Sequence, residues 1–548
     1  MSVVIIGSGA GGGASAWALA QQGIRVLVLE AGPDYDPYQD YRLHRDDWEL
    51  GYFPAKQRHK LQYSFATLQS LASRYDTLRS WNKNRGLMNP TDRRKAGKYH
   101  HVQGVGGSTL HFTGEAHRLH PQAFRMRSRF GVAADWPFSY EELESDYVTA
   151  EQIVGVAGLD QYSQRPRSAA FPLQAHPLSY ASQRVVSTSQ QTGLRWDHNP
   201  LAALSEPYDD RPGCNYCNNC NKGCPRRDKG SVDVTFLHKA RQSGYCEIKS
   251  GCTVLRVVSG NNDRVKGVEY VDEAGERQWV PAEIVIVACG AVETPRLLLL
   301  SEGDRGQGLA NESGLVGKNF METLYWASSG LHSDNLGSYR GLPADLISWT
   351  FNAPDAIPGV IGGCRFNVNT GETGINGPVN YAVRAVPGWG LAHKRRMREA
   401  IGHALSIGAI GESLPNSQSY ITLDRQHNDR FDRPIAQIHS YLEQGEIDRL
   451  MFMAAKCREI LAACGITELF EEYGAYDIFN TTHVFGTARM GDDPNNSVVN
   501  GHCRSHRWKN LFIVDASVFP SSGGGESPSL TIEALAIRTA RYIRNNSV

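Results

Sequence analysis

The sequence predicts an α/β fold of two domains, and three observations lead to this prediction. A short apolar strand, Val3–Ile6, runs directly into glycines and an Ala-rich helix. Apolar runs typical of buried parallel strands return in the middle of the chain, at Ile284–Ala288, and near its end, at Leu511–Val514. The stretches between these runs contain both strand-like and helix-like sequence patterns. We therefore expect one domain assembled from discontinuous pieces and a second domain made of the insertions.

The individual elements follow from local pattern and composition. Val3–Ile6, a helix over Ala14–Gln22 and a strand over Ile24–Leu29 form a β-α-β unit at the N-terminus. Acidic residues and helix formers predict a helix over Tyr140–Val154. Further strands are expected at Val254–Val258, Gly267–Val271 and Ile421–Asp424, and further helices at Thr294–Ser301, Glu446–Ala463 and Thr531–Asn545.

Composition and charge exclude several classes of protein. The chain has 548 residues, of which 41% are hydrophobic, so it can bury a large core. Lys+Arg and Asp+Glu both number 57, a balance that argues against nucleic acid or an acidic membrane surface as the main partner. No apolar run approaches the ~20 residues of a membrane-spanning helix. Because no basic segment precedes the first strand, we expect no secretory signal.

The glycine-rich segment after the first strand has the form of a dinucleotide fingerprint. Gly7, Gly9 and Gly12 give the spacing G-x-G-x-x-G between a strand and a helix. The first permits a tight turn, the second lets the backbone approach a pyrophosphate, and the third allows close helix–strand packing. Glu30 ends the second strand at the usual distance of roughly 20 residues, where its carboxylate can bind ribose hydroxyls. The pattern predicts a dinucleotide site but does not separate NAD from FAD.

Five segments in fixed order resemble the glucose–methanol–choline (GMC) oxidoreductases. They span nearly the whole chain, and they are Val28–Pro33 after the fingerprint, Gly104–Thr109, Asp135–Pro137, Gly290–Pro295, and His483–Gly491 with Asn510–Pro520. The resemblance implies FAD as the cofactor and oxidation of a CH–OH group as the reaction. It also implies a Rossmann-like FAD-binding domain over residues 1–135, 231–318 and 471–548. The substrate domain, with a mainly antiparallel sheet, takes residues 136–230 and 319–470.

The resemblance assigns the acid–base chemistry to His483, which precedes the Gly-Thr-Ala-Arg-Met-Gly segment. Taking a hydride from carbon also requires removing a proton from oxygen, and a neutral imidazole can accept that proton at pH 7. The family usually pairs this histidine with a second His or Asn. Here the corresponding position is Ser527, which can make a hydrogen bond but cannot carry charge. Ser527, Glu526 or a water fills the role, or Ser527 is merely the first residue of a helix.

Further cofactor contacts come from the same resemblance. Gly106, Gly107 and Ser108 belong to a flavin-contacting glycine loop, and Val254 and Asp515 are also assigned to the cofactor site. His111 occupies the place at which pyranose oxidases attach flavin covalently. It either forms such a bond or packs over the ring.

Four of the 11 cysteines lie in one short run, within a loop expected over residues 212–226. Cys214, Cys217, Cys220 and Cys224 have the spacing C-x2-C-x2-C-x3-C-P, which is that of bacterial ferredoxins. In the flavoprotein subunits of dye-linked sugar dehydrogenases, the spacing of Cys214, Cys220 and Cys224 is associated with a [3Fe–4S] cluster. Cys217 is extra, and it either completes a [4Fe–4S] cluster or points away. Zinc and a redox-inert group of thiols are the alternatives.

These features together predict an FAD-dependent sugar or glycoside dehydrogenase, of the glucose, fructose, gluconate or glucoside 3-dehydrogenase type. We expect its electrons to pass through an iron–sulfur cluster to a cytochrome c or a quinone. Related complexes are exported folded with a small subunit that carries the signal, so a periplasmic or membrane-associated location is expected if that partner exists, and a cytoplasmic one otherwise. The alternatives are a pyranose- or sterol-type oxidase that uses O2, and a non-catalytic electron-transfer flavoprotein.

Overall fold

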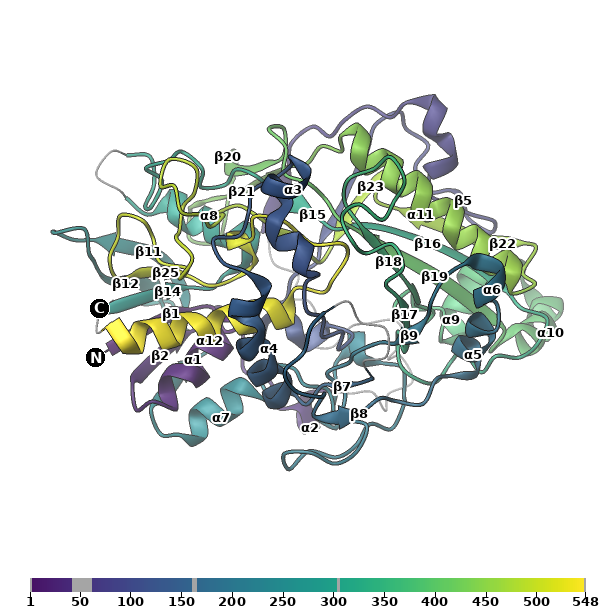
Figure 1. Ribbon diagram of the computed structural model, residues 1–548, viewed down its shortest axis with the longest axis horizontal. Coiled ribbons are helices and arrows are strands. Elements are labelled where there is room, and N and C mark those ends of the chain that lie inside the picture. Colours follow the sequence, from purple (N-terminus) through teal and green to yellow (C-terminus); the bar gives the residue numbers. More distant parts are fainter. Residues whose placement is uncertain (1, 42–61, 160–164, 303–305, 547–548) are drawn as a thin grey trace.

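The computed structural model describes residues 2–41, 62–159, 165–302 and 306–546. The chain folds around two sheets, a parallel one near which both chain ends lie and a larger antiparallel one at the opposite end of the molecule (Figure 1). Within the described ranges, no helix is both long and apolar enough to cross a membrane.

The parallel sheet has five strands in the spatial order β10-β2-β1-β14-β25. Every pair in it is parallel. The central strands are almost fully buried, which explains their continuous apolar sequences. The strands are β1 (Ser2–Ile6), β2 (Arg25–Leu29), β10 (Cys246–Lys249), β14 (Ile284–Val287) and β25 (Leu511–Ile513).

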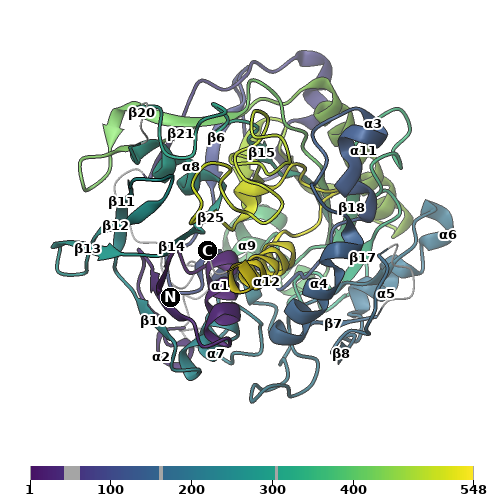
Figure 2. The ribbon, with the colours of Figure 1, turned by 60° about the vertical axis from the view of Figure 1, so that its left-hand side comes forward.

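Helices cover this sheet, and the first and last of them pack together. Helix α1 (Ala10–Ala20) contacts both α12 (Ser529–Asn546) and α7 (Phe236–Gln242), and α12 also contacts α4 (Tyr140–Val154). Helices α1 and α12 therefore lie side by side in one layer, as Figure 2 shows from a second side. Close approach of α1 depends on glycine, because a Cβ on Gly11 would lie 1.7 Å from the carbonyl oxygen of Val514.

The second sheet has eight strands in the order β5-β4-β22-β16-β19-β18-β17-β9, and each adjacent pair is antiparallel. Helix α11 (Gln444–Ala463) packs on β16 and β19. The strands are β4 (Trp81–Asn82), β5 (Gly86–Leu87), β9 (Asp197–His198), β16 (Leu324–Leu331), β17 (Leu346–Ser348), β18 (Cys364–Val368), β19 (Ala404–Gly411) and β22 (Leu469–Gly474).

Smaller sheets and short helices complete the described chain. One small sheet holds β11 (Thr253–Ser259), β12 (Val265–Val271) and β13 (Arg277–Pro281), and another holds β20 (Tyr420–Asn428), β21 (Pro434–His439) and β3 (Tyr63–Phe65). Paired strands are β15 (Met321–Glu322) with β24 (Val484–Phe485), β23 (Ile478–Thr481) with β6 (Lys95–Tyr99), and β7 (Ala157–Gly158) with β8 (Leu173–Gln174). The helices that bear on the site are α8 (Gly290–Leu300), η2 (Gly107–His111), η4 (Cys220–Lys222) and η6 (Ala516–Val518).

The predicted α/β class, the Rossmann-like N-terminus and the antiparallel second sheet are confirmed. The parallel strands come from three separate stretches of the chain, as a discontinuous domain requires. The second sheet, however, also takes β4 and β5 from residues 81–87, which lie in the range expected for the FAD-binding domain. The exact domain boundaries stay a prediction.

Candidate active site

A cavity of about 1060 Å³ lies where the two large sheets meet. Its wall includes the carboxyl ends of β1, β2 and β14, and residues of β16, β18 and β19 from the antiparallel sheet. Ligands of open parallel sheets bind outside the carboxyl ends of the strands. Sites for one small molecule usually enclose roughly 300–1000 Å³, so this cavity can hold a cofactor and a substrate together.

The fingerprint glycines have the geometry that a dinucleotide needs. Gly7 has a φ of +90°, and a Cβ on Gly12 would lie 1.9 Å from the Gly7 carbonyl oxygen, so the turn and the packing of α1 both require glycine. Gly9 lines the cavity, and a Cβ there would meet nothing closer than 3.9 Å. No side chain among the described residues caps α1, so its first N–H groups remain available to a phosphate. These residues fit a dinucleotide cofactor.

Glu30 lies on the cavity wall directly after β2, as predicted, and its carboxylate also organises the surrounding loops. Oε2 accepts hydrogen bonds from the Ser8 amide (3.0 Å) and the Ser8 hydroxyl (2.6 Å), and Oε1 accepts one from the Gly32 amide (2.9 Å). Burial raises the pKa of Glu30, while these hydrogen bonds oppose the shift. Because Glu30 lines the cavity, its carboxylate can also accept a hydrogen bond from a ribose hydroxyl.

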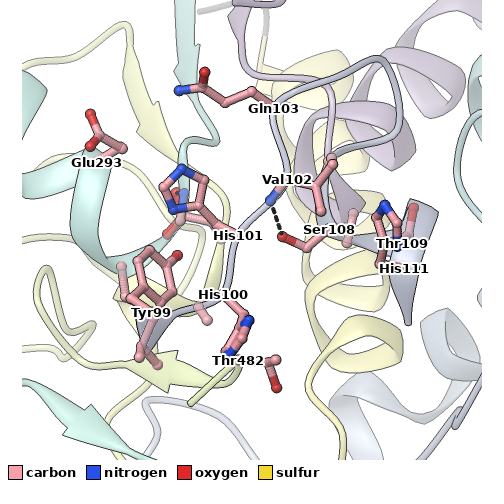
Figure 3. Close-up of a pocket in the computed structure, with 18 of the residues that line it drawn as sticks. Tyr99, His100, His101, Val102, Gln103, Ser108, Thr109, His111, Glu293 and Thr482 are labelled. Atoms are coloured by element: carbon pink, nitrogen blue, oxygen red, sulfur yellow. Dashed lines mark hydrogen bonds between the residues drawn. The ribbon is translucent and has the colours of Figure 1, made fainter. Parts of the chain in front are cut away.

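The predicted flavin loop packs against the fingerprint. Gly106 and Gly107 have φ values of +108° and +57°, and a Cβ on Gly107 would lie 2.7 Å from the Gly9 Cα. Figure 3 shows the adjoining wall, where the Ser108 hydroxyl accepts a hydrogen bond from the Val102 amide (3.3 Å). His111, from the same loop, lies on the cavity wall, and its Nδ1 is 2.9 Å from the Asn221 carbonyl oxygen.

Val254 and Asp515 also line the cavity. The Asp515 carboxylate accepts hydrogen bonds from the Gly290 amide (3.0 Å) and the Thr294 hydroxyl (2.6 Å), and from the Ser517 amide (2.8 Å). It thereby joins the N-terminus of α8 to η6, and its burial raises its pKa. The structure thus brings most of the predicted cofactor residues to one cavity, whereas Gly12 and Gly106 pack beside it without lining it. The lining residues among them are Gly7, Gly9, Glu30, Gly107, Ser108, His111, Val254 and Asp515.

His483 lies on the wall of the same cavity, directly before β24. Its backbone carbonyl accepts hydrogen bonds from the Thr323 amide (3.0 Å) and from the Thr481 hydroxyl (3.1 Å), which fix the loop. Burial lowers the pKa of the imidazole to about 4, because a desolvated imidazolium is unfavourable; Glu115 opposes this shift. The side chain is therefore neutral at pH 7, as a proton acceptor must be.

Ser527 faces the cavity within a buried polar network. Its hydroxyl donates a hydrogen bond to Glu115 Oε2 (2.9 Å), and its amide donates one to His117 Nδ1 (3.1 Å). Glu115 Oε2 is also 2.5 Å from Arg365 Nη2, and Oε1 accepts a hydrogen bond from Asn199 (2.9 Å). Burial disfavours the Glu115 charge, but Arg365 and His117 lower the pKa of Glu115 to about 2. This carboxylate is therefore ionised at every working pH.

Glu526 does not replace the second His or Asn of the family, a role that the sequence left open between Ser527, Glu526 and a water. Its Oε1 accepts hydrogen bonds from Arg165 Nη2 (2.6 Å) and from the His120 amide (3.1 Å). The group beside Ser527 is instead Glu115, from a segment far away in the sequence.

Sequence reasoning missed Glu115 and two further polar residues of the cavity, Arg365 and Glu372. A signal for Arg365 exists, because β18 alternates between polar and apolar residues. Cys364, Phe366 and Val368 belong to a hydrophobic core, whereas Arg365 and Asn367 face the other way. For Glu115 and Glu372 the sequence offers no comparable pattern.

The predicted cysteine cluster is not supported by the described geometry. Burial raises the pKa of all four thiols, and the other three are near enough to Cys220 to raise its pKa further. Cys224 Sγ contacts Asp228 Oδ1 at 2.9 Å, and Cys217 is exposed as a residue although its thiol is partly desolvated. Across the described ranges, no three His, Cys, Asp or Glu side chains converge as a metal ion would require. The thiols in this arrangement do not form a ligand set for a cluster.

The cysteine loop nevertheless lies against the flavin loop. The buried Lys229 ammonium donates hydrogen bonds to the carbonyl oxygens of Leu110 (3.0 Å), Phe112 (3.1 Å) and Cys220 (2.8 Å). The contact between His111 and Asn221 joins the same two segments. Lys229 therefore fixes both loops in one position.

Sequence models of known families identify the family of this chain. Sequence models of the GMC oxidoreductases match residues 155–324 and 415–536, together more than half of the chain, and a model described as an NAD(P)-binding Rossmann-like domain matches residues 5–35. The chain is a GMC oxidoreductase. It is accordingly an FAD-dependent oxidoreductase that acts on CH–OH groups of alcohol- or sugar-type substrates. This finding does not support the non-catalytic alternative.

Relatives of this GMC oxidoreductase match over nearly its full length. The 2-methyl-1,2-propanediol dehydrogenase of Mycolicibacterium austroafricanum is 29% identical, with 99% of this chain and 94% of the relative covered. The fructose dehydrogenase large subunit of Gluconobacter japonicus is 29% identical (99% and 98% covered). The gluconate 2-dehydrogenase flavoprotein of Pantoea cypripedii is 28% identical (99% and 93% covered).

A solved structure shares the fold of this GMC oxidoreductase. The pyridoxine 4-oxidase of Mesorbium loti superposes with a TM-score of 0.62 at 16% identity, with 100% of this chain and 99% of that chain covered. At this identity the likeness concerns the fold alone.

Proposed function

We propose that this GMC oxidoreductase is a dehydrogenase that oxidises a carbinol of a sugar or glycoside and delivers the electrons to an external acceptor. The observation that carries the proposal is one cavity whose wall holds both the fingerprint glycines and the His483 imidazole. When bound there, FAD supplies the acceptor for the hydride that leaves the carbinol carbon. The residues of the chain then have to orient the carbinol and remove its proton.

His483 and Ser527 divide this work. The neutral His483 imidazole accepts the carbinol proton, since its lowered pKa keeps it unprotonated until the substrate arrives. Ser527 gives its own hydrogen to Glu115, so its oxygen lone pairs are left to accept a hydrogen bond from the substrate. The permanent charge of Glu115, close to His483, favours the imidazolium that forms.

The names of the relatives support the choice of substrate and acceptor. Fructose, gluconate and a vicinal diol are polyhydroxylated, and the three relatives are called dehydrogenases. The term large subunit in one name supports a multi-subunit assembly. We also propose a small exported partner subunit, and a cytochrome c or a quinone as the acceptor. Export with that subunit gives a periplasmic or membrane-associated location, and a chain without such a partner is cytoplasmic.

An iron–sulfur cluster in this enzyme is supported by the spacing of Cys214, Cys217, Cys220 and Cys224 alone. The four thiols lie near one another, but within the described ranges they do not converge as a ligand set. The roles proposed above for His483 and Ser527 do not require a cluster. Iron and acid-labile sulfide analysis of the purified protein decides the matter. Three to four iron atoms per chain indicate a [3Fe–4S] or [4Fe–4S] cluster, and zinc or no metal excludes it.

An O2-using oxidase is the second candidate, because a cholesterol oxidase and a paromamine 6'-oxidase are also relatives. One experiment separates the two functions. Purified holoenzyme is titrated anaerobically with sugars, glycosides and alcohols while the flavin absorbance is followed, and the reduced enzyme is then mixed with O2 or with a dye. Bleaching by a sugar with fast reoxidation by dye supports the dehydrogenase. Fast reoxidation by O2 supports the oxidase, and no bleaching by any carbinol contradicts both.

A further inference from the structure

Strand β18 presents a row of polar side chains on the side opposite the core. Arg365 and Asn367 alternate with buried apolar residues, and Asn369 follows directly after the strand. Arg365 and Asn369 line the active-site cavity. The row therefore lies beside the position where His483 meets the substrate.

Three atoms of this row have no hydrogen-bond partner among the described residues, namely Arg365 Nη1, Asn367 Oδ1 and Asn369 Oδ1, and the first and the last belong to residues that line the cavity. Arg365 Nε donates to the Gly525 carbonyl (2.7 Å) and Nη2 to Glu115, but Nη1 has no partner among the described residues. Arg365 is only 1% exposed, so water does not compensate from the surface. The Asn369 Oδ1 atom is likewise buried without a partner in the described structure. Buried polar atoms are rarely left unpaired, so these two indicate a ligand.

Glu372 brings an acidic group to the same wall. Its Oε2 accepts a hydrogen bond from Asn367 Nδ2 (3.2 Å), and its side chain lines the cavity. Burial and the nearby charge of Glu115 raise the pKa of Glu372 to about 7, while Arg365 opposes the shift. No ion pair of Glu372 occurs within the described residues. Arg365 is already committed to Glu115, so the Glu372 carboxylate can serve a bound molecule.

We propose that Arg365, Asn369 and Glu372 form a subsite for a second hydroxyl group of the substrate, adjacent to the carbinol that is oxidised. Arg365 Nη1 donates a hydrogen bond to this hydroxyl oxygen, and the hydroxyl hydrogen is donated to Glu372 or Asn369. The inference rests on the proposed function, and it assigns to these three residues the recognition of a hydroxyl group next to the one that is oxidised.

A hydroxyl group fits this subsite better than the other common substituents. It both donates and accepts, and the subsite offers one unused donor and two acceptors. An ammonium group donates only, and it would leave Arg365 Nη1 unpaired beside a like charge. An apolar group would leave all three polar residues unsatisfied, which is costly in a buried site.

The test compares pairs of substrates that differ by one hydroxyl, such as cyclohexane-1,2-diol with cyclohexanol, and a sugar with its deoxy analogue. Holoenzyme, Glu372→Ala and Glu372→Gln are measured for KM and kcat with each pair. The exposed Glu468→Gln serves as the carboxylate control, because Glu468 contacts only Lys83 on the surface. Flavin absorbance and the thermal midpoint confirm that each variant is folded and loaded.

Loss of a hydrogen bond to a charged group in a buried site is expected to raise KM for the diol about tenfold to a hundredfold. The KM for the substrate of each pair that lacks the second hydroxyl is expected to change less than about twofold. A merely structural role of Glu372 would not produce this difference between the two substrates of a pair. Equal effects on both partners overturn the subsite, although oxidation of both still upholds the proposed function. A 2-amino analogue that binds wild type better than the diol, and loses that advantage in Glu372→Ala, overturns it in favour of an ammonium subsite.

Discussion

The substitution Lys229→Met tests whether one buried ammonium holds the flavin loop in place. Lys229 is 1% exposed and donates to three carbonyl oxygens, two of them in or beside the flavin loop and one in the cysteine loop. Each hydrogen bond to a charged group contributes ~1.5–3 kcal/mol. Burying the ammonium costs several kcal/mol of desolvation free energy, and this cost is absent when methionine replaces the lysine. The net loss is therefore about 3 kcal/mol, or roughly a hundredfold in the folding equilibrium.

The assay is urea unfolding of the purified holoprotein, with FAD retained after gel filtration as a second readout. We expect Lys229→Met to unfold at lower urea and to lose FAD, because Leu110 and Phe112 flank His111 on the cavity wall. Lys239→Met is the matched control: Lys239 forms a surface pair with Asp209 (2.7 Å), and such pairs contribute ~0–1 kcal/mol. A Lys229→Met protein that keeps its FAD and unfolds within ~1 kcal/mol of the control refutes this reasoning.

Three other predictions follow from the site. His483→Ala should keep the flavin spectrum yet slow anaerobic flavin reduction about a hundredfold or more; a rate within threefold of wild type contradicts its role as base. Gly107→Ala should lose FAD, because its Cβ would lie 2.7 Å from the Gly9 Cα, whereas Gly86→Ala, with a similar φ of +75° but open space, should retain it; equal flavin-to-protein ratios exclude the steric explanation. The kcat/KM for a diol should rise with pH as Glu372 ionises near its pKa of about 7, a value that burial and the charge of Glu115 raise and Arg365 lowers; a Glu372→Gln profile that keeps the same rise refutes the assignment.

Local pattern was sufficient for much of the fold. The helix over Tyr140–Val154 has the predicted bounds, and the apolar runs near residues 3, 26, 285 and 512 all became parallel strands. Strand β10 (Cys246–Lys249) escaped prediction because its sequence alternates polar and apolar residues at a sheet edge and lacks an apolar run. The two-residue strands of the antiparallel sheet are too short to leave a signal.

The candidate site was likewise predictable only in part. Gly9, Glu30 and His483 lie in local motifs, so their place on the cavity wall was predictable. The environment of Ser527 was not, because Glu115 and Arg365 reach it from segments that are remote in the sequence. Contacts between segments that are remote in the sequence produce no local or periodic pattern that a single sequence could reveal.

The contact between Gly11 and the carbonyl of Val514 has a consequence for biosynthesis. Helix α1 is synthesised long before β25 and α12 (β25 begins at Leu511 and α12 at Ser529), so its sheet and its helical layer are complete only when those later elements have been made. A nascent chain that lacks these elements offers no finished pocket for the coenzyme, because Asp515, Ser527 and Ile532 belong to the cavity wall. Loss of even the final helix would be expected to yield a colourless product.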